Sequence, residues 1–163
     1  MSGVNFAEIE QQFVRDRINP DFTWRAYDDY SPLNRMTANL GDARVALVTT
    51  VGAHLEDQEP FDLKDPAGDP TFREIPTNVS SGDLELTHRG YNTRQSKQDP
   101  NVVVPVDHLK AARECGRIGG LGSNIYSFMG FIADTDPLMD ESAPEVARRL
   151  KADRTDLVLL VPT

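Results

Sequence analysis

The sequence predicts an α/β protein with a mostly parallel sheet and helices on both faces of that sheet. Residues 43–52, ARVALVTTVG, are an apolar, β-branched run without alternation, which is typical of a strand buried on both faces. Residues 142–154 begin with Ser-Ala-Pro-Glu, the pattern of a capping box with proline in the first helical turn. The apolar strand 157–161, LVLLV, follows this helix. A helix leading into a buried strand closes a βαβ unit, so we expect a Rossmann-like three-layer architecture.

The composition is that of an acidic globular domain. The chain has 163 residues, 26 acids and 17 bases, so its formal net charge is −9. This charge disfavours nucleic acids and anionic membrane surfaces as partners, because both repel an acidic chain at long range. The N-terminus lacks a secretory pattern, and the longest apolar runs are too short for a membrane helix. The single cysteine, Cys115, excludes an internal disulfide framework and fits a reducing compartment, so we expect a cytoplasmic protein.

Residues 1–40 are predicted to form an N-terminal helix and an irregular aromatic flap, ahead of an α/β domain over residues 41–163. The helix is predicted by apolar residues at helical spacing, which are Val4, Phe6, Ile9, Phe13 and Ile18. Asn19-Pro20 ends it. The flap contains four aromatic residues close together in the sequence, Phe22, Trp24, Tyr27 and Tyr30. We expect them to pack together; a ligand-facing flap is the alternative.

The middle of the chain alternates loops with short strands. An acidic, proline-rich segment over residues 54–70 predicts a loop. Residues 72–75 and 84–88 are then predicted as strands. Residues 102–105, VVVP, fit either a strand or an extended entry to the next helix.

The next helix is predicted from Asp107, as N-cap, to Cys115, with Gly116 as its C-terminal stop. Residues 117–132 contain several glycines without a clear period. They predict a short strand, a glycine turn and an apolar segment.

The last strand is unusual because a functional loop is expected to follow it. Both of its faces are predicted to be buried, so it should lie inside the sheet. In open α/β sheets, the loop after such a strand opens into the ligand crevice, and the next helix N-terminus favours an anion or a thiolate. Thr163 stands where that loop would begin. We therefore expect an α/β domain that is incomplete at its C-terminal side; a protein that ends on a strand is the alternative.

Four segments resemble the glycine/sarcosine/betaine reductase selenoprotein B family, which is related to D-proline reductase. They run in family order over most of residues 42–163 and are VALVTTVGAHLEDQEPFDL, GDPTFREIP, DPNVVVPVDHLKAARECGRIGGLGSNIYSFMG and DLVLLVPT. The resemblance implies a selenocysteine directly after Thr163, whose selenolate reductively cleaves a C–N bond of an amino-acid-like substrate. It also implies a pyruvoyl group on a partner subunit, other reductase subunits as partners and a small amino-acid or amine substrate. A homo-oligomer is compatible with it.

Three hypotheses follow for function. In the first, the chain is the N-terminal part of such a reductase, ended where a UGA codon is read as stop, and it is inactive alone because no catalytic residue lies within it. In the second, it is a non-enzymatic subunit or binding module, with its final strand as a pairing edge. In the third, it is a complete small enzyme in which His54 or His88 is the general base.

Six residues are candidates for substrate binding. His54 and His88 each follow a predicted strand, where they can face the crevice and bind a carboxylate or move a proton. Ordinary loop histidines are the alternative. The other four lie in the third family-like segment and are expected to line the site, namely Asn101, Asp107, Tyr126 and Ser127.

Other conspicuous residues are assigned structural roles. Cys115 lies near a helix C-terminus, where the dipole disfavours a thiolate, and His108 is expected to be exposed. Gly119, Gly120 and Gly122 predict a tight turn rather than a phosphate loop, because Ile125 replaces the third glycine of the dinucleotide pattern. The three histidines lack zinc spacing. The acidic loop is expected to be solvated, with a calcium or magnesium site as the alternative, and contains Glu56, Asp57, Glu59, Asp62, Asp65 and Asp69.

Overall fold

The computed structural model describes residues 4–24 and 34–163. The chain separates into two compact units, Met1–Arg35 and Met36–Thr163. The domain division expected at residue 40 stays a prediction, because compactness alone does not show that a unit folds independently.

In the described part of the first unit, helix α1 spans Phe6–Arg17. The Asn5 side chain accepts a hydrogen bond from the Glu8 amide at its N-terminus, which satisfies one free N–H group. Trp24 returns to the helix, where its indole nitrogen donates to the Ala7 carbonyl at 3.1 Å. The predicted apolar face is exposed on this helix, and Phe6 is 73% accessible. Tyr27 and Tyr30, which were expected in the aromatic flap, lie outside the described residues.

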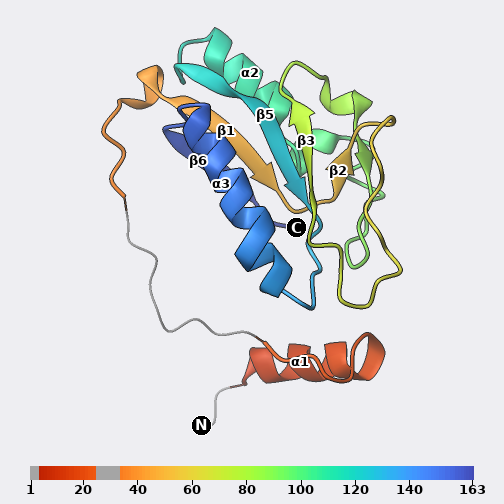
Figure 1. The fold of residues 1–163 in the computed structure, drawn as a ribbon. Helices are drawn as coiled ribbons and strands as arrows, with labels where there is room; N and C mark the ends of the chain where they lie inside the picture. The colour runs from red at the N-terminus through yellow and green to blue at the C-terminus, as the bar shows by residue number, and fades with distance from the viewer. Residues whose placement is uncertain (1–3, 25–33) are drawn as a thin grey trace. The chain divides into compact units, whose positions relative to one another are not determined.

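The second unit is built on a four-stranded mixed sheet (Figure 1). At its centre, β1 (Arg44–Thr49) pairs in parallel with β5 (Gly120–Phe128) on one side and with β6 (Leu157–Val161) on the other. The other edge strand, β3 (Phe72–Pro76), runs antiparallel to β5. A separate antiparallel pair joins β2 (Ala53–His54) to β4 (Glu85–Leu86). The α/β prediction is confirmed. The prediction of a mostly parallel, Rossmann-like sheet is confirmed only in part, because β1, β5 and β6 are parallel whereas β3 and the β2–β4 pair are antiparallel.

Helices lie on both faces of the sheet, as predicted. Helix α2 (Val106–Glu114) places Leu109 against Val45 and Leu121 on one face. Helix α3 (Ala143–Ala152) places Val146 against Tyr126 and Phe128 on the other. None of the helices in the described part of the chain has the length and apolar content needed to span a bilayer.

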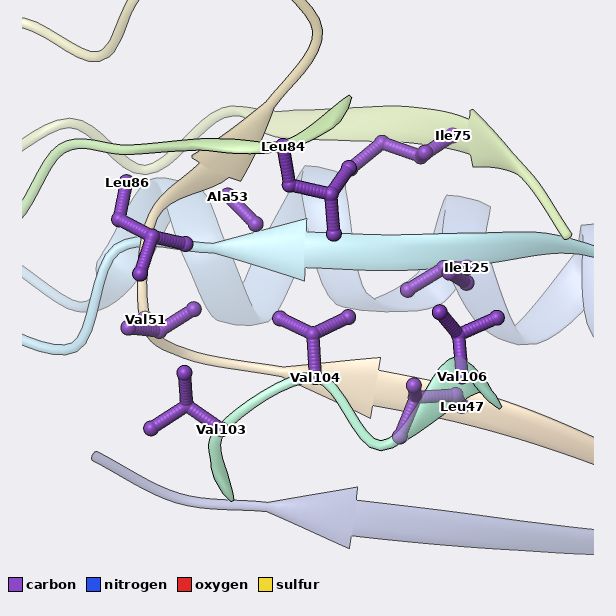
Figure 2. Close-up of a cluster of buried hydrophobic side chains, with 10 residues drawn as sticks. All are labelled: Leu47, Val51, Ala53, Ile75, Leu84, Leu86, Val103, Val104, Val106 and Ile125. Atoms are coloured by element: carbon purple, nitrogen blue, oxygen red, sulfur yellow. The ribbon is translucent and has the colours of Figure 1, made fainter. Parts of the chain in front are cut away.

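The largest apolar cluster lies on the α2 face and extends toward the β2–β4 pair. Figure 2 shows Leu47 of β1, Ile75 of β3 and Ile125 of β5 with Val104 and Val106, which come from the entry to α2. All five are essentially inaccessible to solvent. Burying each of these aliphatic side chains stabilises the fold by about 1.5–3 kcal/mol. The cluster therefore holds the sheet and the β2–β4 pair together.

Strand β6 lies at the sheet edge, which makes the prediction of an internal, doubly buried strand wrong. Only β1 pairs with it among the described strands. Leu159 is 38% exposed and Leu160 is 67% exposed. The apolar sequence indicates a tendency toward burial, but the number of neighbouring strands is set by tertiary structure.

Strand β5 is longer than the sequence predicts, because its glycines permit close packing instead of forming a turn. It continues for nine residues through Gly120 and Gly122. A Cβ on Gly122 would lie 3.1 Å from the Ala46 Cβ, and one on Gly119 would lie 2.3 Å from the Asp42 carbonyl carbon. Because Gly119 and Gly122 have no side chains, the start of β5 can pack closely against the start of β1.

The predicted helix caps are wrong in detail. Asp107 lies inside the first turn of α2, and Pro105 is the N-cap. Ser142 has helical backbone angles and makes no capping bond, because the π-helical turn Leu138–Ser142 precedes α3. The expected C-terminal stop is present, since Gly116 has a positive φ of 72° directly after the cap residue of α2.

The remaining short elements connect these strands. They are the 3₁₀ turns Leu40–Asp42, Ser81–Asp83 and Pro100–Val102. The last of them shows that residues 102–105 are the entry to α2 and not a strand. The strand predicted over residues 84–88 contains only the two residues of β4.

Candidate functional site

The carboxyl ends of β1, β5 and β6 meet at one edge of the sheet. The Thr50 amide donates to the Val161 carbonyl at 3.2 Å, and the Thr163 amide donates to the Thr50 hydroxyl at 2.8 Å. A bridge between Val51 and Met129 joins the chain after β1 to the chain after β5. Because ligands bind at the carboxyl ends of strands in open α/β sheets, this edge is the candidate functional site.

The β2–β4 pair is held directly against this edge by Gly52. The Gly52 amide donates to the Phe128 carbonyl at 2.8 Å, and its carbonyl accepts from the Thr87 amide at 2.9 Å. Gly52 has a φ of 69°, and a Cβ there would lie 1.8 Å from the Thr87 oxygen. Glycine is required for this close approach of the two backbones. Because His88 directly follows Thr87, the approach brings His88 to the end of the sheet.

His88 is held in one tautomer by its own loop. Its Nδ1 accepts hydrogen bonds from the amides of Gly90, at 3.0 Å, and Tyr91, at 2.8 Å. The neutral ring therefore bears its proton on Nε2. Burial lowers the pKa of the imidazole below its ordinary value, which favours this neutral form at physiological pH.

The Nε2 atom of His88 points to the strand ends. It is buried and has no hydrogen-bond partner among the described residues. A Cβ on Gly130 would lie 2.4 Å from this nitrogen, 2.6 Å from the Thr163 carbonyl oxygen and 2.9 Å from the Thr50 carbonyl oxygen. All three atoms therefore surround one small space that is open only because residue 130 is glycine. The structure thus places the predicted His88 at the edge of the sheet.

His54 is buried beneath this region, with both ring nitrogens engaged. Its Nδ1 lies 2.9 Å from the Leu55 carbonyl oxygen, and its Nε2 lies 2.9 Å from the Thr87 hydroxyl. A carbonyl only accepts, so Nδ1 is the donor and Nε2 accepts from Thr87. His54 therefore binds Thr87, the residue directly before His88. In this arrangement neither ring nitrogen of His54 is available to a substrate.

Asn101 and Asp107 are brought together at the start of α2. The Asn101 amide group donates to the Ser81 hydroxyl at 3.0 Å and to the Asp107 carboxylate at 3.2 Å. Asn101 accepts in turn from the Asp107 amide at 3.1 Å. Lys110 forms an ion pair with Asp107 at 3.3 Å and also donates to the Val79 carbonyl. This network joins α2 to the Ser81–Asp83 turn. Among the described residues, none of the hydrogen bonds in the network involves His88.

The Asp107 carboxylate is expected to contribute stability that disappears in acid. Hydrogen bonds from Ser81 and Asn101, together with Lys110, hold its pKa at about 2, below the value for an unfolded chain. The stabilisation is therefore complete above pH 4 and is lost as the pH falls toward 2. Because the side chain is 38% exposed, we expect Asp107→Asn to lower the free energy of unfolding at pH 6 by only about 1 kcal/mol.

Urea unfolding at pH 6 and at pH 2.5 measures this difference. The exposed carboxylate Asp140 provides the matched control, and Asp140→Asn should change stability little at either pH. A difference between wild type and Asp107→Asn that is equally large at both pH values would contradict the assignment.

Tyr126 and Ser127 lie next to each other on β5 but do not form a common site. The Tyr126 hydroxyl donates to Glu74 at 3.2 Å on the α3 face, and burial with the Glu74 charge raises its pKa to about 12. Arg149 of α3 forms an ion pair with the same Glu74. Ser127 is fully buried, and its hydroxyl has no partner among the described residues.

The remaining conspicuous side chains lie elsewhere. Cys115 caps α2 and is exposed, with its thiol donating to the Ala112 carbonyl at 3.4 Å. In the acidic loop, Asp69 accepts from the amides of Asp62 and Thr71, so this carboxylate organises the loop. Over residues 4–24 and 34–163, no three His, Cys, Asp or Glu side chains are close enough together to hold a metal ion.

The sequence interpretation missed Thr50, Gly52 and Gly130 as residues of the site. A signal was present for the glycines, because Gly52 ends the strand predicted over residues 43–52 and Gly130 lies near the end of the apolar segment predicted within residues 117–132, where tight turns are common. The reason that they are glycines is their close contact with Thr87 and His88, which lie far away in the sequence.

Comparison with known proteins identifies related sequences. The model of the glycine/sarcosine/betaine reductase selenoprotein B family matches residues 20–163. The chain is 37% identical over 125 residues to the D-proline reductase subunit gamma of Acetoanaerobium sticklandii, covering 77% of this chain and 50% of that protein. It is 31% identical over 85 residues to the betaine reductase complex component B subunit beta of Peptoclostridium acidaminophilum, covering 52% of this chain and 19% of that protein. The matches thus span half or less of these relatives. No solved structure matches the chain.

Proposed function

Because the chain belongs to the glycine/sarcosine/betaine reductase selenoprotein B family, we propose that it is the N-terminal portion of a component of a multi-subunit reductase. The proposed reaction is reductive cleavage of a C–N bond in an amino-acid-like substrate. The observation that supports this function most is the family match over residues 20–163, which includes the whole α/β unit. The names of both relatives, subunits of D-proline and betaine reductases, point to the same class of complex.

We propose that the nucleophile is a selenocysteine directly after Thr163. When present, its selenolate would form a C–Se bond to the substrate carbon as the C–N bond breaks and the amine leaves, and a thiol reductant would supply the two electrons of the net reduction. Two features of this chain suit such a group: β6 leads to the carboxyl edge of the sheet, and Thr50 holds the Thr163 amide there at 2.8 Å. His88 provides a buried N–H group at the same edge.

The remaining components would come from partner subunits. A pyruvoyl group on a partner would bind the substrate amine, and other reductase subunits would complete the complex. Of the six candidate substrate residues, His88 lies at the strand ends, and its Nε2 has no hydrogen-bond partner within residues 4–24 and 34–163. The proposed assembly is cytoplasmic, where thiols and selenols remain reduced.

A non-enzymatic docking subunit is the alternative, in which β6 would be the pairing edge. This edge strand leaves Leu159 and Leu160 accessible, and its outer backbone groups can pair with another strand. By contrast, the third hypothesis loses one of its two candidate bases, because both ring nitrogens of His54 are bonded within the fold.

Activity measurements on the native complex test the proposed function. The product of the complete gene region, expressed with selenium and purified with its associated subunits, should contain selenium and cleave a C–N bond. Glycine, sarcosine, betaine and D-proline are offered separately, because each releases a different nitrogen-containing product. The 163-residue chain alone is the control and should be inactive. Robust turnover by that chain, or a selenium-free complex that turns over none of the four substrates, would contradict the proposal.

A further inference from the structure

The segment over residues 89–98 is basic, although the chain as a whole is acidic. Its sequence, RGYNTRQSKQ, contains two arginines, one lysine and no acid, whereas the whole chain has a formal net charge of −9. The segment begins directly after His88, and the amides of Gly90 and Tyr91 donate to the Nδ1 atom of that ring. Positive charge therefore lies beside the carboxyl edge of the sheet, where it attracts anions.

Hydrogen bonds hold this basic segment in one shape. The Lys97 amide donates to the Thr93 carbonyl at 2.8 Å. The hydroxyl oxygens of Tyr91 and Ser96 are 2.8 Å apart, and Ser96 is fully buried. Because the backbone is anchored in this way, the outward side chains of the segment lose less conformational freedom when a ligand binds.

A hollow of about 580 Å³ lies on the basic segment, and this volume is typical of small-molecule sites. The residues that line it are Gly90, Tyr91, Asn92, Arg94, Gln95 and Gln98. This lining combines one guanidinium with three carboxamides and contains no carboxylate. Asp99, the next acid along the chain, instead accepts a hydrogen bond from the Asn101 amide at 3.1 Å. The lining is therefore suited to an anionic ligand.

Arg94 supplies the positive charge of the hollow. Within residues 4–24 and 34–163, its guanidinium has no ion-pair or hydrogen-bond partner. By contrast, the arginine at the start of β1, Arg44, pairs with Asp153 at 2.8 Å. A guanidinium presents two parallel N–H groups that match the two oxygens of a carboxylate. The carboxamides beside it add further N–H donors and carbonyl acceptors.

We propose that this hollow binds the carboxylate of a small amino-acid-like ligand, with the Arg94 guanidinium as its bidentate partner. The inference rests on the proposed function, since it names the substrate group that this part of the chain would recognise. Gln95 and Gln98 line the same hollow and would bind the remaining polar groups of the ligand. Arg94 is thus a binding residue at the carboxyl edge, next in the chain to the loop that holds His88.

Nuclear magnetic resonance titrations of the ¹⁵N-labelled 163-residue chain test this site. Betaine and choline are matched probes, because both carry a trimethylammonium group and only betaine carries a carboxylate. Glycine and ethanolamine form a second pair of the same kind. Betaine and glycine should shift the amide resonances of Gly90, Tyr91 and Gln95, whereas choline and ethanolamine should leave them in place. Equal shifts from both members of each pair, or no shift of these resonances by either carboxylate, would overturn the proposal.

Two variants of the basic segment test the role of Arg94. Arg94→Gln removes the guanidinium, and Lys97→Gln is the matched control, because Lys97 is an exposed cation of the same segment that does not line the hollow. The affinity for betaine should fall at least about tenfold in Arg94→Gln and by less than about twofold in Lys97→Gln. Equal losses in the two variants would refute a site at Arg94. The comparison of betaine with choline on the wild-type chain remains decisive if a variant fails to fold.

Binding by the 163-residue chain requires no reductase activity, so this inference and the proposed function can fail separately. Betaine binding that depends on Arg94, in a protein whose native complex shows no C–N cleavage, would leave the carboxylate site and remove the reductase function. Cleavage by the native complex with the same KM in wild type and Arg94→Gln would do the reverse.

Discussion

Replacement of Gly130 with alanine is expected to lower the free energy of unfolding by about 2–4 kcal/mol. The new methyl group would lie 2.4 Å from His88 Nε2, 2.6 Å from the Thr163 carbonyl oxygen and 2.9 Å from the Thr50 carbonyl oxygen. Two of these atoms belong to the backbone, so a side-chain rotation cannot relieve the contact. Either the ends of β1 and β6 separate or the His88 ring moves out, and both changes disrupt the candidate site.

Urea unfolding measures the effect of Gly130→Ala, with Gly120→Ala as the control. Gly120 is also in the β5 region, but a Cβ there meets nothing within 4 Å, so Gly120→Ala should be close to neutral. The ¹⁵N spectrum of His88 should change in the Gly130 variant and remain unchanged in the Gly120 variant. Equal stability of the two variants would show that the space beside Gly130 is larger than the structure indicates.

Gly52→Ala is expected to be at least as damaging, with a loss above about 3 kcal/mol. Its φ of 69° is unfavourable for alanine, and its Cβ would lie 1.8 Å from the Thr87 carbonyl oxygen. The contact involves backbone on both sides, so relief requires the β2–β4 pair to move away from the end of the sheet. His88 would move with Thr87.

Gly116→Ala separates the two causes of this loss. Gly116 has a similar φ of 72°, but a Cβ there meets nothing within 4 Å. Its replacement should cost only the backbone strain of a left-handed residue, about 1–2 kcal/mol. The excess loss in Gly52→Ala over Gly116→Ala then measures the contact with Thr87. Equal losses in the two variants would contradict a close approach at Gly52.

Local patterns predicted the existence of most elements because burial and turns leave local signals. The apolar run in β1 is buried as expected, and Gly116 ends α2 with a positive φ. The direction of β3 and the edge position of β6 were not predictable in this way. Both depend on which strands become neighbours, and the residues of a single strand do not specify that choice.

The candidate site was predictable only in part for the same reason. The rule that functional residues follow parallel strands selected His88, which does lie at the sheet end. It also selected His54, whose ring instead bonds Leu55 and Thr87. Asn101 and Asp107 bond each other directly and share Ser81, a partner that no sequence spacing indicated. Hydrogen-bond satisfaction distinguishes these roles, and it becomes visible only in three dimensions.

We propose that a reactive selenium atom follows β6 at the carboxyl edge of the sheet. Tandem mass spectrometry of the native gene product, isolated from cells grown with selenium, tests it at the peptide that contains Leu157–Val161 and Thr163. We expect a peptide that continues beyond Thr163 directly into selenocysteine, with the selenium isotope pattern on that residue. A native peptide that ends at Thr163, or that continues into a residue without selenium, would contradict it.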